Sequence, residues 1–463
     1  MTIDERGAPD RPVESSAAKP RRRTAPGWAG VRPLLMRLHF YAGVFVGPFL
    51  VIAALTGIAY IYTPQVEDAV HDHELHVAAS DTWLPLERQV DIAREAFPEG
   101  ALKSVRPAPT ATDTTQVIFT PPRATPSHSQ TVFVDPHTGE VRGNLETYGS
   151  GQALPVRAWI DVLHRNLHLG EVGRIYSELA ASWLGVIVLA GFGLWLSRRI
   201  ALRRAARRDK PVAEPATGGA AKRGRALGRH AVVGLWAAIG LLFLSATGLT
   251  WSGHAGENIG ALRSALDWST PSVSAAVDPS PTGSDVGLDA VRESTLRAGL
   301  AAPVEIRVPT APGTGYVVAQ VGRSWPSHAD SMAVDPATGQ VTDTLRFDDY
   351  PLGAKLSKWG IDAHMGFLFG VPNQIVLTLL GLAIVGLVGW GYRMWWLRRP
   401  PMGGSRFGRA PARGSWRRAP AKALVPILLV GAALAWSMPV LGVSLLAFLV
   451  LDAVIGWSLS DPA

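Results

Sequence analysis

The 463-residue sequence contains no cysteine. This absence excludes disulfide bonds, thiolate zinc sites, cysteine-held iron–sulfur clusters and the C-x-x-C-H attachment of haem. Any metal must therefore be held by histidine, carboxylate or methionine. The sequence also lacks a P-loop, a dinucleotide-binding glycine pattern, a nucleophile elbow and H-E-x-x-H. Nothing in it supports a hydrolase or a nucleotide-driven pump.

The apolar residues, 47% of the chain, are gathered into long blocks. A membrane-spanning helix needs about 20 apolar residues. Four blocks have about this length, namely Leu38–Tyr62, Leu179–Leu196, Ala231–Trp251 and Ile375–Leu397. A fifth block, from Ala423 to Trp457, is broken at Pro439 and predicts a hairpin of two short helices. We therefore predict a polytopic α-helical membrane protein in a lipid bilayer.

The basic residues are concentrated in three segments. Of 45 Lys and Arg, 28 lie in residues 1–37, 198–229 and 393–422, beside only 6 Asp and Glu. In residues 63–177 and 253–371 the acidic residues outnumber the basic ones. The positive-inside rule then places both chain termini and the basic loops in the cytoplasm, and the two acidic insertions outside. Topology accounts for the basic runs, so we expect no nucleic-acid partner.

Several features recur 200 residues apart. The segment VDPHTGEV (Val134–Val141) returns as VDPATGQV (Val334–Val341), and His164, within LHRNLHL, is matched by His364. A self-match at a fixed offset is the signature of a duplicated unit. We predict that span, outside module and span occur twice, giving four core spans as parallel repeats about an axis near the membrane normal.

The first and third spans share a further pattern. His39 stands 17 residues before Thr56, which is followed by glycine. His230 stands the same 17 residues before Thr247, which is also followed by glycine. The resemblance between these spans thus goes beyond hydropathy.

Each outside insertion predicts a small α+β module, with one helix against a few-stranded antiparallel sheet. Residues Pro85–Phe97 show helical apolar spacing. Runs rich in β-forming residues follow at Leu102–Arg106, Gln116–Thr120 and Gln130–Val134. The second insertion repeats this order, with DVGLDAVRESTLRAGL followed by VEIRV, GYVVAQV and SMAVDPATGQV.

These features together predict the order of the chain. It comprises a disordered cytoplasmic tail (1–33), a first span (34–63), a first outside module (64–158), an outer-side helix with the second span (159–197), a basic cytoplasmic linker (198–229), a third span (230–252), a second outside module (253–358), a fourth span (359–398), a second basic linker (399–422) and the C-terminal hairpin (423–458).

Four of the twelve histidines occupy matched positions at span ends. His39 and His230 lie at cytoplasmic ends, and His164 and His364 lie at outer ends. If the halves pack face to face, each side of the membrane gains one pair of imidazoles. Such pairs supply the two axial ligands of a b-type haem, and ionisable groups within membranes are usually functional. We predict two haem b groups; for each histidine taken singly, an ordinary interfacial residue is the alternative.

Other polar residues are weaker candidates. His168, on the same helix face as His164, could replace it as a haem ligand, although the matching position is Leu368. His71, His73 and His76 could capture a metal ion or chelate, or belong to an ordinary polar loop. Asp452 in the C-terminal block is expected near a helix end, with a proton path as the alternative.

Four segments carry a resemblance to a known family: RLHFYAGVFVGPFLVIAALTG, LHRNLHLGEVGRIYSELAASWLGVIVLAGFGLWL, GRHAVVGLWAAIGLLFLSATGLTWS and DAHMGFLFGVPNQ. They resemble the PepSY-associated transmembrane family, also called iron-regulated membrane proteins, over about residues 34–400. The two outside modules resemble PepSY domains, including their closing V-D-P-x-T-G turn. The sequence departs from the family at His168, where an apolar residue is more usual, and at His254, where an aromatic residue is common.

This resemblance implies a bacterial cytoplasmic (inner) membrane protein tied to iron uptake. Some members are haem-containing ferric-siderophore reductases, and the matching positions for haem ligands are His39, His164, His230 and His364. The leading hypothesis is therefore electron transfer from a cytoplasmic or quinol donor, through two haems, to ferric iron in a siderophore or other chelate. Two alternatives stay open. One is a non-catalytic PepSY sensor or protease regulator, and the other is a chelate transporter.

Overall fold

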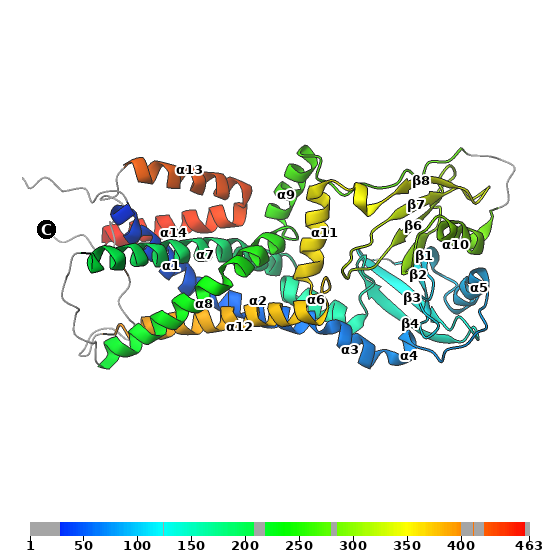
Figure 1. Cartoon of the computed structure of the whole chain (residues 1–463), viewed down its shortest axis with the longest axis horizontal. Helices are drawn as coiled ribbons and strands as arrows, with labels where there is room; N and C mark the ends of the chain where they lie inside the picture. The colour runs from blue at the N-terminus through cyan, green and yellow to red at the C-terminus, as the bar shows by residue number, and fades with distance from the viewer. Residues whose placement is uncertain are drawn as a thin grey trace, which may run out of the picture.

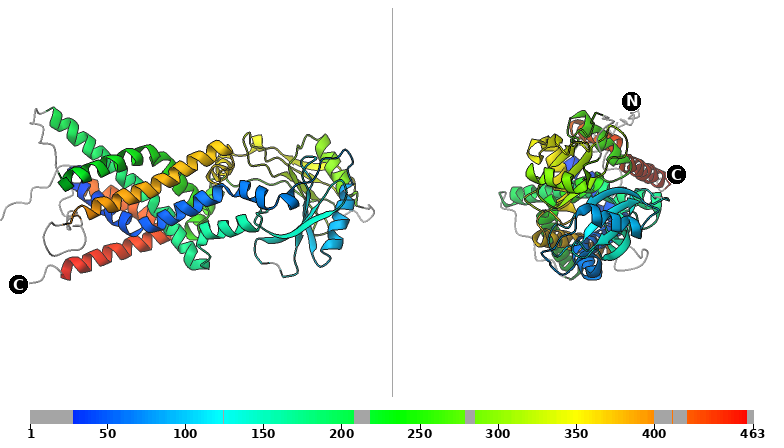
Figure 2. Two further views of the ribbon diagram at one scale, coloured as in Figure 1. Left: turned by 90° about the horizontal axis from the view of Figure 1, so that it is seen from below. Right: turned by 90° about the vertical axis from the view of Figure 1, so that its right-hand side faces the viewer.

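The computed structural model describes residues 28–123, 125–207, 218–278, 285–399, 411 and 421–458. A bundle of long helices forms one end of the molecule and a single large sheet forms the other (Figures 1 and 2). Most of the predicted N-terminal tail, and parts of both predicted basic linkers, lie outside the described residues.

Three helices in the described part of the chain are long and apolar enough to cross a membrane. They are α7 (Gly170–Ala206), α8 (Gly218–Leu249) and α12 (Val371–Trp396). Helices α7 and α8 extend beyond the predicted spans, so the described parts of the predicted linker 198–229 are largely helical. This extension follows from composition, because Ala, Leu and Arg are strong helix formers.

The predicted first span is not one straight helix. It consists of α1 (Trp28–Phe45) and α2 (Gly47–Ile61), which meet at a bend of 57°. Pro48 causes the break, because proline lacks an N–H group and its ring clashes with the carbonyl four residues earlier. That carbonyl, on Val44, instead accepts a hydrogen bond from the Tyr392 hydroxyl at 2.6 Å.

The spans form a closed ring. Helix α1 packs along α7, α7 along α8, α8 along α12 and α12 along α2. Their contact surfaces form an apolar core that includes Leu50, Trp183, Leu184, Leu241 and Ile384. Because lipid tails are as apolar as these side chains, close packing rather than the hydrophobic effect must hold such helices together in a bilayer.

Short helices connect this bundle to the sheet. They are α3 (Thr63–Val70), α4 (Asp72–Leu75), α6 (Pro155–Asn166), α9 (His254–Ala265), the 3₁₀ turn η1 (Phe347–Asp349) and α11 (Leu352–His364). Helix α6 packs against α2 and α7, and α11 packs against α8. Both lie where the bundle meets the sheet (Figure 1).

Apart from the short connecting helices, each insertion contains the helix and three strands that the sequence predicts, together with a fourth antiparallel strand. The first contains α5 (Leu86–Ala96), β1 (Ala101–Arg106), β2 (Thr115–Thr120), β3 (His128–Val134) and β4 (Val141–Tyr148). The second contains α10 (Gly287–Arg297), β5 (Val304–Arg307), β6 (Tyr316–Gln320), β7 (Ser331–Val334) and β8 (Val341–Leu345).

The two sets of strands join into one sheet, which the sequence did not predict. The strand order is β4-β3-β2-β1-β5-β6-β7-β8, and β1 pairs antiparallel with β5. An ion pair of 2.7 Å between Arg106 and Glu305 crosses this join. Helices α5 and α10 share one core with the strands and lie at the end of the molecule far from the bundle (Figure 1).

The C-terminal block forms a helical hairpin, as predicted, with α13 (Ala421–Ser437) and α14 (Pro439–Ser458). Asp452 lies towards the C-terminal end of α14 and is not alone. It forms an ion pair with Arg37 of α1, whose side chain is 8% exposed. Burying an unpaired charge costs several kcal/mol, so the Asp452 carboxylate accounts for the buried charge of Arg37.

Candidate functional site

A cavity of about 470 Å³ lies where the bundle meets the sheet. We call it the sheet-side cavity. Its walls come from the spans, from helices α6 and α11, and from two loops of the sheet, the β4–α6 turn and the β6–β7 loop. Its volume lies in the usual range for small-molecule and cofactor sites, roughly 300–1,000 Å³.

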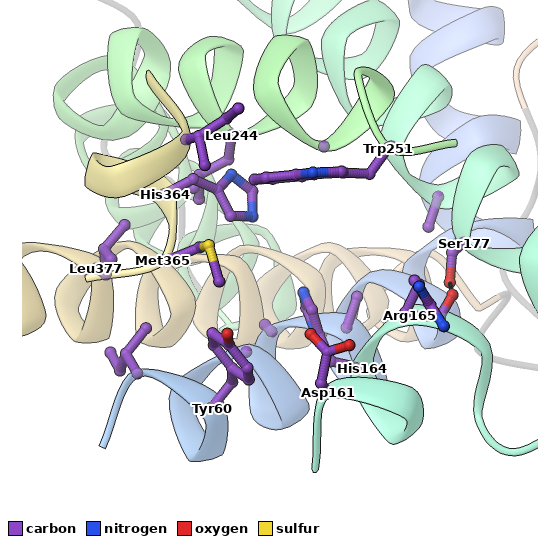
Figure 3. Close-up of a pocket in the computed structure, with 18 of the residues that line it drawn as sticks. Tyr60, Asp161, His164, Arg165, Ser177, Leu244, Trp251, His364, Met365 and Leu377 are labelled. Carbon is purple, nitrogen blue, oxygen red and sulfur yellow. Dashed lines mark hydrogen bonds between the residues drawn. The ribbon is translucent and has the colours of Figure 1, made fainter. Parts of the chain in front are cut away.

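His164 and His364 enter this cavity from opposite walls (Figure 3). His164 stands near the end of α6 and His364 at the end of α11. Burial lowers the pKa of His164 to about 4 and that of His364 to about 3, so both imidazoles are neutral at pH 7. The structure thus brings together the pair that the sequence predicts for the outer side.

Each of these rings is anchored by a threonine. His164 Nδ1 lies 2.9 Å from Thr56 Oγ1, and His364 Nδ1 lies 2.6 Å from Thr247 Oγ1. Both hydroxyls already donate to the carbonyl oxygen four residues earlier in their own helices, at 2.9 and 2.7 Å. Because a hydroxyl has one hydrogen, each threonine oxygen must accept from the imidazole Nδ1–H.

The glycine after Thr56 makes room for the ring. A Cβ atom on Gly57 would lie 3.1 Å from His164 Cε1, closer than ordinary van der Waals contact. At the matching Gly248 a Cβ would lie 3.9 Å from His364 Cε1, which is an ordinary contact. The Thr-Gly pairs in the two spans therefore have a local explanation: threonine orients the imidazole, and at Gly57 the missing side chain admits it.

The other two histidines meet at the opposite end of the bundle. The ring centroids of His39 and His230 are 6.0 Å apart and their planes are nearly perpendicular, at 87°. His39 Nδ1 bonds to the carbonyl of Ile187 at 3.0 Å, and His230 Nδ1 to that of Leu387 at 3.1 Å. The two acceptor residues are again 200 positions apart. Gly191 admits the His39 ring, since a Cβ there would lie 3.0 Å from Cε1.

All four imidazole rings are therefore held in the same way, through Nδ1. Each uses Nδ1 in its hydrogen bond, and within the described part of the chain none of their Nε2 atoms has a hydrogen-bond partner. Carbonyl and hydroxyl-oxygen acceptors fix the proton on Nδ1, which leaves a lone pair on Nε2. A metal-bound histidine typically has this arrangement, with the second nitrogen donating to a protein oxygen.

Charged residues surround the sheet-side cavity. Arg157 pairs with Glu67 at 3.2 Å, and Glu67 also accepts the backbone N–H of Leu154 at 2.7 Å. Burial raises the pKa of Glu67, although Arg157 opposes the shift. Burial likewise raises the pKa of Asp161, which stands one turn before Arg165 on α6.

The cavity wall formed by α7 contains a fully buried carboxylate. Glu178 of α7 is 1% exposed and accepts the backbone N–H groups of His254 and Ala255, both at 3.0 Å. These groups begin α9, so Glu178 acts as its N-terminal cap. Nearby, the Trp251 ring packs edge-on against His364, with centroids 5.5 Å apart, and closes that side of the cavity.

His168 does not share this environment. It is exposed, its ring packs on Trp159, and its Nε2 lies 3.0 Å from the Trp159 carbonyl oxygen. It is absent from the cavity lining. The structure therefore separates His168 from the four anchored histidines, and its possible role as a substitute for His164 is not supported.

The three histidines after the first span also turn to separate partners. His71 faces Glu74 at 3.6 Å, His73 accepts from Arg142 at 2.8 Å, and His76 contacts Asp68 at 2.9 Å. Among the described residues no group of three or more His, Asp or Glu side chains could hold a metal ion. The metal site at these histidines remains a prediction without a donor cluster.

Some residues of the site were not predicted. The Thr-Gly pairs were recognised only as a repeat, and their contact with the histidines required the structure. Arg165 follows His164 directly and resembles an interfacial basic anchor, while Arg323 lies in a loop with no distinctive pattern. Both line the sheet-side cavity.

Comparison with known families gives one match. The family model described as the PepSY-associated TM region matches residues 36–398, more than half of the chain. This range contains all four anchored histidines and both sets of strands. No curated protein matches the chain.

Proposed function

Because this chain belongs to the PepSY-associated TM family, we propose that it is a b-type haem protein that passes electrons across the membrane to ferric iron in a siderophore or other chelate. One observation carries the proposal. Four histidines form two pairs, and each ring is held through Nδ1 so that Nε2 is left for a metal.

The donor set suits a haem with two axial imidazoles. A metal–imidazole bond is about 2 Å long, so an iron between two rings would separate their centroids by roughly 6 Å, near the 6.0 Å of His39 and His230. At the other end, the sheet-side cavity offers both imidazoles and an apolar wall that includes Leu50, Leu184 and Ile384. The histidines therefore suit this cofactor at both positions, and the sheet-side cavity offers room for it at His164 and His364.

The protein's own contribution would be orientation and exclusion of water. A bound haem supplies one-electron chemistry through its iron, and its potential depends on the axial ligands and the surrounding dielectric. Thr56 and Thr247 fix two of the rings, and backbone carbonyls fix the other two. Between the pairs, the apolar core of the bundle provides a low-dielectric environment.

The family and the charge pattern support a specific topology. We place the protein in a bacterial cytoplasmic membrane as a duplicated unit, with its two sheet modules as PepSY domains outside and its basic ends in the cytoplasm. The electron donor would then be a cytoplasmic reductant or a quinol near His39 and His230. A chelate would dock near the sheet-side cavity, whose lining includes the β4–α6 turn.

Spectroscopy of the purified protein tests this proposal. Protein expressed with haem precursor should show the absorption of low-spin, bis-imidazole haem, and the reduced protein should be reoxidised when a ferric chelate is added anaerobically. A Fe(II)-specific chelator should capture one iron per electron lost. Protein without haem after such expression would contradict the proposal and favour a non-catalytic sensor.

A further inference from the structure

Three of the four arginines that line the sheet-side cavity have no carboxylate partner among the described residues. Arg165 and Arg323 both line the cavity, and neither forms an ion pair with any residue that the structure describes. Arg174 of α7 is the third such arginine. By contrast, Arg157 pairs with Glu67, and Lys358 nearby pairs with Asp362. Buried charges in proteins are normally paired, so the exceptions require explanation.

Arg323 is held in place by contacts that use little of its hydrogen-bonding capacity. Its guanidinium lies over the Phe367 ring, 5.0 Å from the centroid, and donates from Nη1 to Met365 Sδ at 3.5 Å. A thioether is a weak acceptor, and a guanidinium has five N–H donors. Gly151 admits the group, because a Cβ there would lie 2.6 Å from Nη2. Burial lowers the pKa of Arg323, with Asp362 opposing the shift.

Arg165 is similarly under-used. Its guanidinium lies 5.5 Å from the centre of the Tyr148 ring, and its Nε is buried without an acceptor. Asp161, one turn earlier on α6, also lines the cavity but is not within ion-pair distance of either arginine. The arginine side chains therefore have donors available for a molecule inside the cavity.

We infer that Arg165 and Arg323 bind a carboxylate group of a molecule bound in the sheet-side cavity or at its rim. The planar fork of arginine matches a carboxylate and can donate to both of its oxygens. The inference rests on the proposed function, because two sources of carboxylate are then available. One is the pair of carboxylates on haem itself, and the other is a carboxylate-bearing ferric chelate.

The chain supplies a matched control. Arg123 stands 200 residues before Arg323, in the corresponding β2–β3 loop, but its side chain is exposed and it is absent from the cavity lining. Arg123→Gln should therefore leave ligand binding unchanged. Arg165→Gln and Arg323→Gln each remove a charged donor. Arg323→Lys keeps the charge but loses the two-pronged guanidinium, and it replaces Arg323→Gln in the experiment if that variant folds poorly.

The first arm of the experiment tests the haem carboxylates. Full-length apoprotein is reconstituted with haem or with haem dimethyl ester, and the rate of haem transfer to an excess of a haem-free acceptor is measured. If haem is the source, the wild type should hold haem about ten-fold longer than the ester, the effect of one charge-assisted hydrogen bond. Arg165→Gln and Arg323→Gln should lose this preference, and Arg123→Gln should keep it.

The second arm tests the chelate. Haem-loaded protein is titrated with ferric citrate and with a ferric complex of a neutral trihydroxamate. If the chelate is the source, the cavity variants should bind ferric citrate about ten-fold more weakly and the neutral complex equally well. Variants with wild-type melting temperatures that behave like wild type in both arms would overturn the inference.

Failure of the proposed function has a different result. If no protein, including the wild type, takes up haem, the proposed function fails, and ferric citrate binding to the haem-free chain still decides the inference. Binding that weakens in Arg165→Gln and Arg323→Gln but not in Arg123→Gln supports it. Binding that is absent, or independent of both arginines, contradicts it.

Discussion

Glu87 and Asp289 each cap the helix on which the other lies. Asp289 accepts the backbone N–H groups of Leu86 and Glu87 at the start of α5, at 2.7 and 3.1 Å. Glu87 accepts the N–H of Leu288 at the start of α10. Neither N-cap residue, Pro85 or Val286, makes a side-chain hydrogen bond to its helix. At α10 the Asp285 carboxylate accepts only the N–H of Gly287, at 2.9 Å. The two modules therefore complete each other's secondary structure.

Removing either carboxylate should loosen the helix that it caps. We expect Glu87→Ala and Asp289→Ala each to cost about 1 kcal/mol, the usual value of an N-terminal cap. The double variant should cost less than the sum, because the two caps lie in one network. Hydrogen exchange of α5 and α10 in the full-length protein measures the effect.

The control is Asp91→Ala, which removes an exposed carboxylate of α5 paired with Arg94 at 3.2 Å. Such exposed pairs contribute little, so exchange should change much less. Equal effects of Asp91→Ala and Asp289→Ala would refute the reciprocal capping.

His137 should make the first module sensitive to pH. Its Nε2 and Nδ1 lie 2.8 and 2.6 Å from the carbonyl oxygens of Ala111 and Thr82. Carbonyls only accept, so both nitrogens must carry protons, and the bond to Ala111 is the main cause of the raised pKa of His137. When folding raises the pKa of a histidine, the protonated ring stabilises the fold. This stabilisation is complete at pH values below the ordinary pKa of about 6.5, and it is lost as the pH rises through the pKa of the folded state.

Protection against hydrogen exchange around Thr82, corrected for intrinsic rates, should therefore fall as pH rises from 6 to 9. The second module provides an internal control, because Ala337 replaces the histidine there. In the first module the Leu84 N–H donates to the Pro136 carbonyl, and in the second the Val286 N–H donates to the Pro336 carbonyl. The exchange of the Val286 N–H should show no such trend. A parallel decline in both modules, or a decline that persists in His137→Ala, would argue against this role.

Tyr392 should stabilise the bend that Pro48 causes in the first span. Replacing this residue with phenylalanine removes the donor to the Val44 carbonyl, which Pro48 leaves without a helical partner. A buried acceptor left without a donor costs about 1 to 3 kcal/mol. We expect a lower melting temperature of the detergent-solubilised protein. Tyr62→Phe, which removes a hydroxyl bonded to Thr378 at an exposed position, should have a smaller effect.

The ion pair between Arg37 and Asp452 should hold the C-terminal hairpin against α1. Asp452→Asn leaves the buried Arg37 charge without this carboxylate, which typically costs about 3 to 5 kcal/mol. Arg37→Met should cost less, because the Asp452 side chain is 26% exposed. The double variant Arg37→Met/Asp452→Leu should recover most of that loss. Hydrogen exchange of α14 provides the measurement, and Arg32→Met, at an exposed position of α1, is the control. A double variant no more stable than the single ones would contradict this account.

Much of the fold could be predicted from local patterns. Neighbouring residues are enough to predict the strand runs, the helix of each outside insertion and the break at Pro439, because the spacing of apolar side chains and the effect of proline are local. The pairing of β1 with β5 could not be predicted, since either strand reads as an ordinary sheet edge. The capping of α5 and α10 was also hidden, because the capping residues lie about 200 positions from the helices they cap.

The candidate site, like the fold, could be predicted only in part. The four histidines could be chosen from their matched positions, and the structure brings His39 to His230 and places His164 and His364 around one cavity. Arg323 could not be chosen, because its role depends on a loop of the second module reaching Gly151 of the first. Sequence patterns report what a residue's own segment does, and contacts between distant segments have no such signature.

Haem content across a histidine-to-alanine series tests the central claim most directly. The wild type should bind two haems per chain, and each of His39→Ala, His164→Ala, His230→Ala and His364→Ala should bind one. His168→Ala should keep both, because that ring packs on Trp159 outside the cavity. A wild type without haem, or full haem content in both His164→Ala and His364→Ala, would contradict the account.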